Sequence, residues 1–287
     1  MKKVRKAVIP VAGMGTRFLP ITKSIPKEML PIVDKPTIEY IVEECVNSGI
    51  EDILFITSSY KKSIEDYFDQ NFEMQTRLIN NKSKLELLKS VENISSKVNM
   101  YFIRQGEPKG SGHAVKLARH FVGDEPFALL YGDDIIYSEK EPALKQLINL
   151  YEKTKGSNII GVQEVKKEDV YKYGIVEFET GYKIKTIIEK PSIEEAPSTC
   201  AGLGRYIVNP TIFDILDTLE IDERGEYQFT NAMKELMTTE SFYACRYDGK
   251  YYDTGSKIGY LIANIEYGLK NKEIKEELKK YLKSIKL

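Results

Sequence analysis

Short apolar runs alternate with amphipathic stretches along the first half of the chain. Residues 7–12 form an apolar run that leads directly into glycines, which predicts a buried strand. From Pro36 onward, apolar residues follow the i, i+3, i+4, i+7 spacing of a helix that ends near Gly49. The alternation continues and predicts, in order, a strand, two helices and two strands over residues 53–56, 60–68, 72–91, 100–103 and 127–131. Apolar strands separated by helices favour a mostly parallel sheet that is covered on both faces.

The second half of the chain has a more β-rich pattern. Residues 158–165, 174–178 and 182–189 are predicted strands, and the last two are expected to pair as a hairpin across Thr180-Gly181. The elements that follow are predicted as a strand, two helices, a strand and a helix, at 200–208, 210–219, 227–238, 242–247 and from about Ser256. The sequence contains no long linker, internal repeat or low-complexity tract. We therefore expect one α/β domain with a β-rich substrate-binding half.

The last segment, residues 270–287, is rich in charge and still carries an apolar stripe. It holds seven lysines and three glutamates, and its apolar residues are Ile274, Leu278, Tyr281, Leu282 and Ile285. This spacing predicts a C-terminal helix. Two interpretations remain open: the helix folds back on its own domain, or it takes part in oligomerisation.

Length and charge narrow the class of protein. The 287 residues suffice for one large domain or two small ones. Lys plus Arg number 42 and Asp plus Glu number 43, so the formal net charge is −1, which excludes a strongly basic nucleic-acid-binding protein. No apolar run reaches the roughly 18 residues of a membrane span. The basic N-terminus runs into a glycine motif rather than a cleavage site. We predict a cytoplasmic protein that binds neither nucleic acid nor membrane.

Cysteines and histidines are few. Cys45, Cys200 and Cys245 are widely spaced and form no C-x-x-C motif, so we expect small buried hydrophobic residues rather than a disulfide framework or a zinc site. The two histidines are His113 and His120. The chemistry of this protein is therefore expected not to depend on a histidine relay.

The first predicted strand leads into the loop Gly13-Met14-Gly15-Thr16-Arg17, whose backbone N–H groups can approach a phosphate or a base closely. Phe18 stands where a dinucleotide-binding fingerprint needs its third glycine, and the ending of a Walker A loop is absent. Three prolines stiffen the segment that follows, which contains Lys27. We expect Arg17 and Lys27 near the C-terminal edge of the strand, where open α/β sheets bind ligands. Two fixed cations beside a glycine-rich turn indicate a polyphosphate site.

Residues 7–36, AVIPVAGMGTRFLPITKSIPKEMLPIVDKP, strongly resemble the signature of bacterial UTP–glucose-1-phosphate uridylyltransferases. More distantly they resemble all sugar-phosphate nucleotidylyltransferases. Further matches to this family occur in the expected order, and they are Arg104-Gln105-Gly106, Lys109-Gly110-Ser111-Gly112-His113-Ala114, Gly132-Asp133-Asp134, Tyr173-Gly174, Glu189-Lys190-Pro191, Gly204-Arg205-Tyr206 and Asp253-Thr254-Gly255. The resemblance covers roughly residues 5–269.

The resemblance implies a Rossmann-like three-layer α/β/α nucleotidyltransferase fold. Its central sheet would be mixed and mostly parallel, with a small β-rich part that binds the sugar. Residues 1–287 would form a single domain, with a nucleotide-binding half at about 1–135, a sugar-phosphate-binding half at about 136–269 and the helix at 270–287. A homodimer or homotetramer is expected.

The resemblance also implies a reaction. Glucose 1-phosphate would attack the α-phosphorus of UTP in line, which gives UDP-glucose and pyrophosphate with Mg²⁺ as cofactor. A phosphate monoester has its second pKa near ~6 and is largely dianionic at pH 7, so it needs no general base. Alignment and charge neutralisation by Arg, Lys and Mg²⁺ remain as the main tasks. This fits a sequence with two histidines.

By resemblance, basic and acidic residues at the strand ends serve the phosphates and the metal. Arg17 would contact the β- and γ-phosphates and the leaving pyrophosphate. Lys27 would contact the α-phosphate and the sugar phosphate. Asp133 would bind Mg²⁺, and Asp253 matches the second metal carboxylate of related thymidylyltransferases. Asp134 is expected to point to the opposite face, because successive strand residues alternate.

The remaining matches imply a base site and a sugar site. At the base site, backbone groups and one amide would meet uracil, and the residues are Ala12, Gly13, Gly15, Gln105 and Gly110. At the sugar site, Gly174 would donate its N–H to a sugar hydroxyl and Glu189 would accept hydrogen bonds from glucose. Lys190 would contact the sugar phosphate.

One position departs from the family pattern, and two alternatives to the leading function remain. Asn231 stands where the family commonly has Asp, and an amide cannot act as an anionic ligand, so we assign it no catalytic role.

The rival enzyme is a thymidylyltransferase or another sugar-1-phosphate nucleotidylyltransferase. The rival from a different class is a catalytically inactive sugar-nucleotide sensor.

Overall fold

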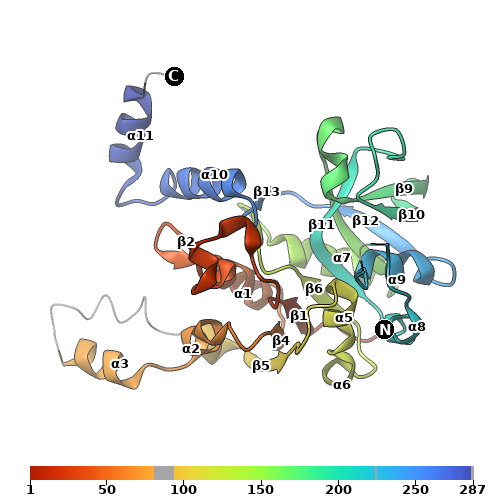
Figure 1. Ribbon diagram of the computed structural model, residues 1–287, viewed down its shortest axis with the longest axis horizontal. Coiled ribbons are helices and arrows are strands. Elements are labelled where there is room, and N and C mark those ends of the chain that lie inside the picture. Colours follow the sequence, from red (N-terminus) through yellow and green to blue (C-terminus); the bar gives the residue numbers. More distant parts are fainter. Residues whose placement is uncertain (81–93, 224, 286–287) are drawn as a thin grey trace.

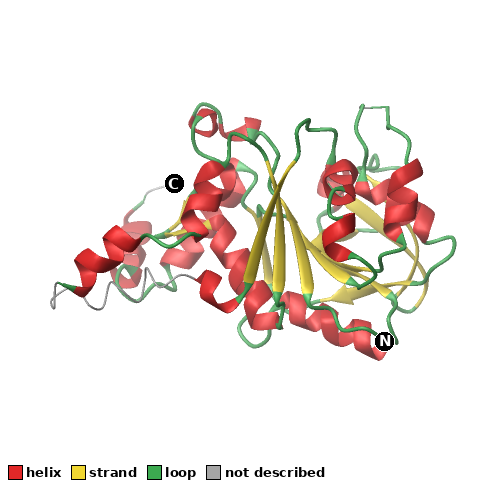
Figure 2. Ribbon diagram, turned by 90° about the horizontal axis from the view of Figure 1, so that it is seen from below, coloured by secondary structure: helices red, strands yellow, loops and turns green. Residues whose placement is uncertain are grey.

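The computed structural model describes residues 1–80, 94–223 and 225–285. A nine-stranded mixed sheet runs through its centre in the spatial order β5-β4-β1-β6-β11-β8-β12-β10-β9. The strands are β1 (Lys6–Pro10), β4 (Asp52–Thr57), β5 (Asn99–Arg104), β6 (Phe127–Leu130), β8 (Asn158–Glu164), β9 (Gly174–Thr180), β10 (Lys183–Glu189), β11 (Cys200–Val208) and β12 (Phe242–Arg246). Figure 2 shows helices on either side of this sheet, which confirms the predicted three-layer arrangement.

Apolar side chains on the two faces of the sheet form two separate cores. On β1, Ala7 and Ile9 pack into one core and Val8 packs into the other, because successive strand residues point to opposite faces. The first core is covered by α1 (Thr37–Ser48), α2 (Lys62–Phe68) and α7 (Ala143–Lys153). The second core is covered by α5 (Ser111–Lys116), α6 (Arg119–Val122), α8 (Ile212–Thr218) and α9 (Phe229–Leu236). Burial on both faces explains the uninterrupted apolar run of the first strand.

Strand direction differs between the two halves of the chain. In the first half, β1 pairs in parallel with β4 and β6, and β4 pairs in parallel with β5. In the second half most neighbours are antiparallel: β11 with β6, β8 and β9, and β10 with β9 and β12. The predicted hairpin is present, with Lys183 opposite Thr180. The strand β11 joins the two halves within one sheet.

Two short ribbons lie outside the main sheet, and neither is predicted by the pattern. The strands β7 (Asp134–Tyr137) and β13 (Lys250–Asp253) pair antiparallel. The strands β2 (Pro31–Ile32) and β3 (Lys35–Pro36) form the other ribbon. The first ribbon matters for function because it brings residues separated by more than a hundred positions to one place.

Most predicted helices are present with small changes at their ends. Helix α1 is followed by Gly49, which caps it with a φ of 89°. Helix α3 (Phe72–Ile79) forms the start of the helix predicted over 72–91, of which residues 81–91 lie outside the described residues. Three helices, α5, α6 and α7, were not among the predicted elements.

The C-terminal helices lie at the edge of the molecule. Helix α10 (Lys257–Gly268) leads to α11 (Lys275–Ser284), which projects away from the sheet in Figure 1 and has no buried residue. A β-carbon on Gly268 would lie 2.7 Å from Leu278, so the start of α11 packs against the end of α10. The helix contacts α10 rather than the sheet, and the two interpretations of the segment both stay predictions.

All three cysteines are buried and free, as predicted. Within residues 1–80, 94–223 and 225–285, no helix combines the length and apolarity that crossing a membrane requires.

Candidate active site

A lysine and an aspartate from distant parts of the chain meet at the C-terminal edge of the parallel strands. Lys27 begins a 3-10 turn, and Asp133 follows β6. Lys27 Nζ donates a hydrogen bond of 2.5 Å to Oδ2 of Asp133. Burial disfavours both charges, but the opposite charges outweigh it, so the pKa of Lys27 is raised and the pKa of Asp133 is lowered. Both side chains are charged at neutral pH.

A second carboxylate, that of Asp253, faces Asp133 across Gly255. The pairing of β7 with β13 places Asp253 opposite Asp134. The N–H and the hydroxyl of Thr254 both donate to the main-chain oxygen of Asp133, at 2.9 and 2.6 Å. A β-carbon on Gly255 would overlap Oδ2 of Asp133 and lie 3.1 Å from Oδ1 of Asp253. The two carboxylates converge on one small space and offer the oxygen donors that Mg²⁺ prefers.

The side chain of Asp134 points elsewhere, as strand alternation predicts. Its Oδ1 accepts a hydrogen bond of 2.6 Å from the hydroxyl of Tyr251. A β-carbon on Gly204, where φ is 61°, would overlap its Oδ2. Burial and the neighbouring charge of Asp133 raise the pKa of Asp134 to about 7. Asp134 therefore belongs to the wall behind the two converging carboxylates.

A buried ion pair supports the turn that carries Asp133. Arg205 Nη2 donates to the main-chain oxygen of Asp134 and to Oε2 of Glu44, both at 2.7 Å. Glu44 Oε1 accepts from the N–H of Leu144 at 2.9 Å. Arg205 and Glu44 are both buried. The pair therefore links β11, α1 and the first turn of α7 to the aspartate turn.

The glycine loop lies at the same edge with most of its backbone accessible. Gly13 is exposed, and Gly15 has a φ of 65°. The hydroxyl of Thr22 donates to the main-chain oxygen of Gly15 at 2.8 Å. Arg17 is exposed and forms no ion pair with any residue that the structure describes. The structure thus leaves the Arg17 guanidinium accessible to an anion and does not bring it into the contact between Lys27 and Asp133.

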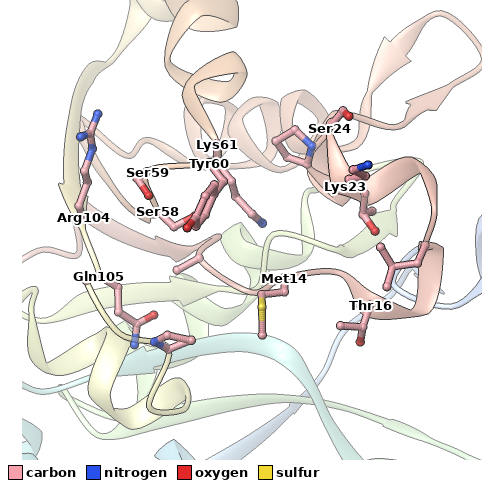
Figure 3. Close-up of a pocket in the computed structure, with 16 residues that line it drawn as sticks. Met14, Thr16, Lys23, Ser24, Ser58, Ser59, Tyr60, Lys61, Arg104 and Gln105 are labelled. Atoms are coloured by element: carbon pink, nitrogen blue, oxygen red, sulfur yellow. The ribbon is translucent and has the colours of Figure 1, made fainter.

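A cavity of about 490 Å³ lies beside the glycine loop (Figure 3). Its walls come from that loop and from the ends of β4 and β5, and they include Ala12, Lys61 and Gln105. Lys61 Nζ forms an ion pair of 2.7 Å with Glu28, and both side chains are buried. Because Glu28 adjoins Lys27 in sequence, this pair ties the wall of the cavity to the lysine of the site.

The segment around Gly110 packs closely against Tyr227, beside the buried Gln105. Gly110 has a φ of 97°, and a β-carbon there would lie 2.6 Å from the main-chain oxygen of Tyr227. The N–H of Tyr227 donates to the main-chain oxygen of Lys109 at 2.9 Å. Gln105 is buried beside this segment. At position 110 both the backbone conformation and the available space favour glycine.

The three predicted sugar-site residues lie together at the end of the β9–β10 hairpin. Gly174 pairs with Glu189, and Oε2 of Glu189 accepts a hydrogen bond of 2.7 Å from the hydroxyl of Thr230. The N–H of Lys190 donates to the main-chain oxygen of Tyr173 at 2.9 Å, while its side chain is exposed. The ammonium group of Lys190 lies 3.4 Å from Oε1 of Glu189.

Between them, two tyrosines feel charges both of the predicted sugar-site residues and of the carboxylates. Burial raises the pKa of Tyr131, and the charges of Glu189 and Asp133 add to this effect. Burial likewise raises the pKa of Tyr173, and the charge of Asp253 is the next largest cause.

Comparison with known proteins establishes the family. The model of the nucleotidyl transferase family matches residues 6–268. The chain belongs to this family. It is 48% identical, over 287 residues and 99% of each chain, to UTP–glucose-1-phosphate uridylyltransferase 1 of Staphylococcus saprophyticus. It is 48% identical, over 289 residues, to the UTP–glucose-1-phosphate uridylyltransferase of Bacillus subtilis, and the match covers 99% of this chain and 98% of the relative. These matches confirm the family resemblance seen in the sequence.

Solved structures of nucleotidyl transferases agree with the fold. The UTP-bound UDP-glucose pyrophosphorylase of Acinetobacter baumannii matches with a TM-score of 0.89 and 38% identity, over 99% of this chain and all of that chain. A UDP-glucose pyrophosphorylase complexed with UDP-glucose matches with a TM-score of 0.86 and 42% identity, over 93% of this chain and all of that chain. These likenesses confirm the predicted nucleotidyltransferase fold.

Several residues that contact the site were given no role from the sequence, among them Glu28, Lys61, Tyr251 and His113. Glu28 and Lys61 had a signal, because each follows a strand end or an adjoining loop at the ligand-binding edge. His113 stands in the matched motif Lys109–Ala114, but no role was assigned to it. Tyr251 had no signal, because its partner Asp134 lies 117 positions away in sequence.

Proposed function

We propose that the chain transfers a uridylyl group from UTP to glucose 1-phosphate, which yields UDP-glucose and pyrophosphate. The observation that carries this proposal is the convergence of Lys27, Asp133 and Asp253 beside the glycine loop. The full-length similarity to enzymes named for this reaction supports it. It is also the activity predicted from the sequence.

In this reaction an oxygen of the glucose 1-phosphate phosphate attacks the α-phosphorus of UTP. A new P–O bond forms, the bond from the α-phosphorus to the bridging oxygen breaks, and the electron pair leaves with pyrophosphate. The attacking phosphate is largely dianionic at pH 7 because its second pKa is near ~6, so no proton has to be removed from it. The protein's task is to align anionic groups and to neutralise their charge.

We assign Mg²⁺ to the space between Asp133 and Asp253. Two carboxylates with several positions left for phosphate oxygens and water are a common protein contribution to a Mg²⁺ site. Among the described residues no group of three or more His, Cys, Asp or Glu side chains could hold a metal, so the nucleotide must supply further ligands. When bound, Mg²⁺ would neutralise charge that develops on the phosphates.

We assign the basic residues to the phosphates according to their position. Lys27, beside Asp133, would contact the α-phosphate and the sugar phosphate. Arg17, exposed on the glycine loop, would contact the β- and γ-phosphates and the leaving pyrophosphate. Lys190, exposed next to Glu189, would hold the sugar phosphate from the other half of the chain.

The base and the sugar are assigned to the two ends of this site. Backbone groups of Ala12 and Gly13 and the amide of Gln105 would meet the uracil edge. Gly15 and Gly110 would let the nucleotide approach the backbone closely. On the other side, Gly174 and Glu189 would hydrogen-bond the glucose hydroxyls, since the two residues pair with each other in the β9–β10 hairpin.

We further propose that the enzyme forms a homodimer or homotetramer. Helix α10 presents an exposed apolar face, formed by Ile258, Leu261, Ile262 and Ile265. Continuous exposed apolar surface of this kind marks interaction sites in soluble proteins. The cytoplasmic location predicted from the sequence stays a prediction.

A matrix of substrates tests the activity. Pyrophosphate release is measured with UTP, dTTP, CTP and ATP against glucose 1-phosphate and other sugar 1-phosphates, with Mg²⁺ present. The proposal expects the highest kcat/KM for UTP with glucose 1-phosphate. A preference for dTTP would instead indicate the thymidylyltransferase alternative. If no pair released pyrophosphate, the proposed activity would be wrong and a sugar-nucleotide sensor would be favoured.

A further inference from the structure

The proposed reaction uses neither histidine of the chain, yet one of them contacts the proposed base site. His113 Nδ1 lies 2.8 Å from Nε2 of Gln105, whose side chain is buried. We propose that His113 is a positioning residue that fixes the orientation of the Gln105 amide, and that this orientation selects uracil over cytosine. The inference rests on the proposed function, because it concerns how the same site reads its base.

The neighbours of Gln105 determine which way its amide faces. The main-chain oxygen of Gly110 lies 3.5 Å from Nε2, and a carbonyl oxygen can only accept a hydrogen bond. The nitrogen of the amide therefore faces Gly110. His113 must then accept at Nδ1, which requires a neutral ring with its proton on Nε2. Both amide hydrogens are directed at acceptors of the protein.

This arrangement leaves the oxygen of the amide available. Within the described part of the chain, no group donates a hydrogen bond to Oε1 of Gln105. Figure 3 shows this oxygen on the side of the cavity where Met14 lies, while the nitrogen is turned away. Gln105 and Met14 both line the 490 Å³ cavity. The amide thus presents a fixed acceptor to the proposed base site.

A fixed acceptor distinguishes the two pyrimidines by elementary chemistry. Uracil carries a hydrogen on N3, which can donate to Oε1 of Gln105. Cytosine has a lone pair at N3, so two acceptors would face each other and both would stay unpaired. A buried polar group without a partner disfavours binding, which is how sites built around one hydrogen bond reject analogues. Thymine also carries a hydrogen on N3, so this arrangement does not separate UTP from dTTP.

The surroundings of His113 keep its ring neutral at physiological pH. Partial burial lowers its pKa, and the positive charges of Lys109 and Lys116 lower it further, while Glu107 opposes them. The ring of Tyr227 lies nearby, with its centroid 6.3 Å away. A protonated His113 would carry hydrogen on Nδ1 and would face the amide nitrogen donor to donor. Protonation would therefore favour the flipped amide.

Three variants test the inference. His113→Leu removes the acceptor, and His113→Asn replaces it with an amide oxygen at nearly the same place. His120→Leu is the matched control, because His120 is the other histidine and is exposed on α6.

We measure kcat/KM for UTP and for CTP with saturating glucose 1-phosphate. The ratio of UTP to CTP is expected to fall about tenfold or more in His113→Leu, mainly through KM, as loss of one buried hydrogen bond predicts. The ratio of UTP to CTP is expected to stay within about threefold of wild type in the other two variants. His113→Asn keeps an acceptor beside Gln105, and His120 does not contact Gln105.

Several outcomes would overturn the inference. One is an unchanged UTP-to-CTP ratio in His113→Leu; another is an equal loss in His113→Asn, since the acceptor would then not matter. A pH series provides a test that does not depend on the folding of His113→Leu. As the pH is lowered from 8 through and below 6.5, the ordinary pKa of histidine, the KM for UTP should rise more steeply in wild type than in His113→Asn, and parallel profiles down to the lowest pH at which both stay folded would contradict the inference. Wild-type enzyme without activity on UTP would instead overturn the proposed function itself.

Discussion

Lys27 and Asp133 form a hydrogen bond of 2.5 Å although 106 positions of sequence separate them. The contact holds a cation directly beside a carboxylate that we assign to Mg²⁺. A phosphate bound by Lys27 must therefore lie close to the metal position, and the two positive centres can act on the same phosphorus. This geometry leads to the first two predictions.

Removing the cation should abolish most turnover while the fold survives. We expect Lys27→Ala to lower kcat about 100-fold or more, as is typical when one charge-stabilising group is lost from an active site. Lys62→Ala, a change of an exposed lysine on α2, is the control and should leave kcat unchanged. Steady-state pyrophosphate release measures the effect, and circular dichroism checks the fold. A near-normal kcat in Lys27→Ala would refute the assigned role.

Crowding the two carboxylates should weaken the binding of Mg²⁺ at the site. A β-carbon in Gly255→Ala would overlap Oδ2 of Asp133, so this carboxylate must move. We expect the concentration of Mg²⁺ for half-maximal activity to rise about 10–100-fold, the range seen when support of a metal ligand is lost. Lys257→Ala, an exposed change two positions later, is the control. An unchanged Mg²⁺ titration would show that the metal does not lie between Asp133 and Asp253.

Chelation tests the metal directly. Treatment with EDTA should abolish pyrophosphate release, and added Mg²⁺ should restore it in wild type. Asp133→Asn should stay impaired at high Mg²⁺, because an amide replaces an anionic ligand. Full activity after exhaustive chelation would contradict a Mg²⁺-dependent reaction.

The buried pair of Arg205 and Glu44 should affect stability more than any surface pair. Arg205→Met leaves the Glu44 carboxylate buried without its partner, and we expect the free energy of unfolding to fall by about 3–5 kcal/mol. The matched control is Arg246→Met, which breaks an exposed pair with Glu164 and should cost about 1 kcal/mol or less. Urea denaturation measures both. Equal losses in the two variants would show that burial of the pair contributes nothing.

Deletion of residues 270–287 tests the C-terminal segment as an oligomerisation element. Helix α11 has no buried residue, so we expect the shortened chain to fold. If the segment holds copies together, the mass measured by light scattering should fall to that of a smaller assembly. An unchanged mass would show that α11 is not required, and attention would pass to the apolar face of α10.

Elements whose signals lie within a short stretch of sequence were predicted from that stretch. The strand β1 and helix α1 were predicted because their apolar periods and the flanking Gly49 are local signals. Helix α7 had such a signal too, since Leu144, Leu147, Ile148 and Tyr151 form a buried stripe at helical spacing. The strands β7 and β13 could not be predicted, because each is stabilised by a partner far away in sequence.

The site shows the same division. Asp133 follows β6, and Lys27 lies on the segment that leaves β1, so their nearness agrees with the topology of parallel strands together with the family resemblance. The partner of Asp134 is Tyr251, and the partner of Gln105 is His113. Side-chain packing after folding decides such pairs, and no spacing in the sequence encodes them. The roles assigned to the site residues stay predictions until the variants are measured.

The continuous sheet has a consequence for how the enzyme can move. Strands of the first and second halves of the chain are hydrogen-bonded neighbours, with β6 and β8 on either side of β11. A hinge between the halves would have to break this backbone ladder. We therefore expect substrates to bind with movement of the loops that follow the strands, while the central sheet keeps its shape. Amide exchange should accordingly be slow and insensitive to substrates in the central strands, and substrate-dependent in the loops that follow them.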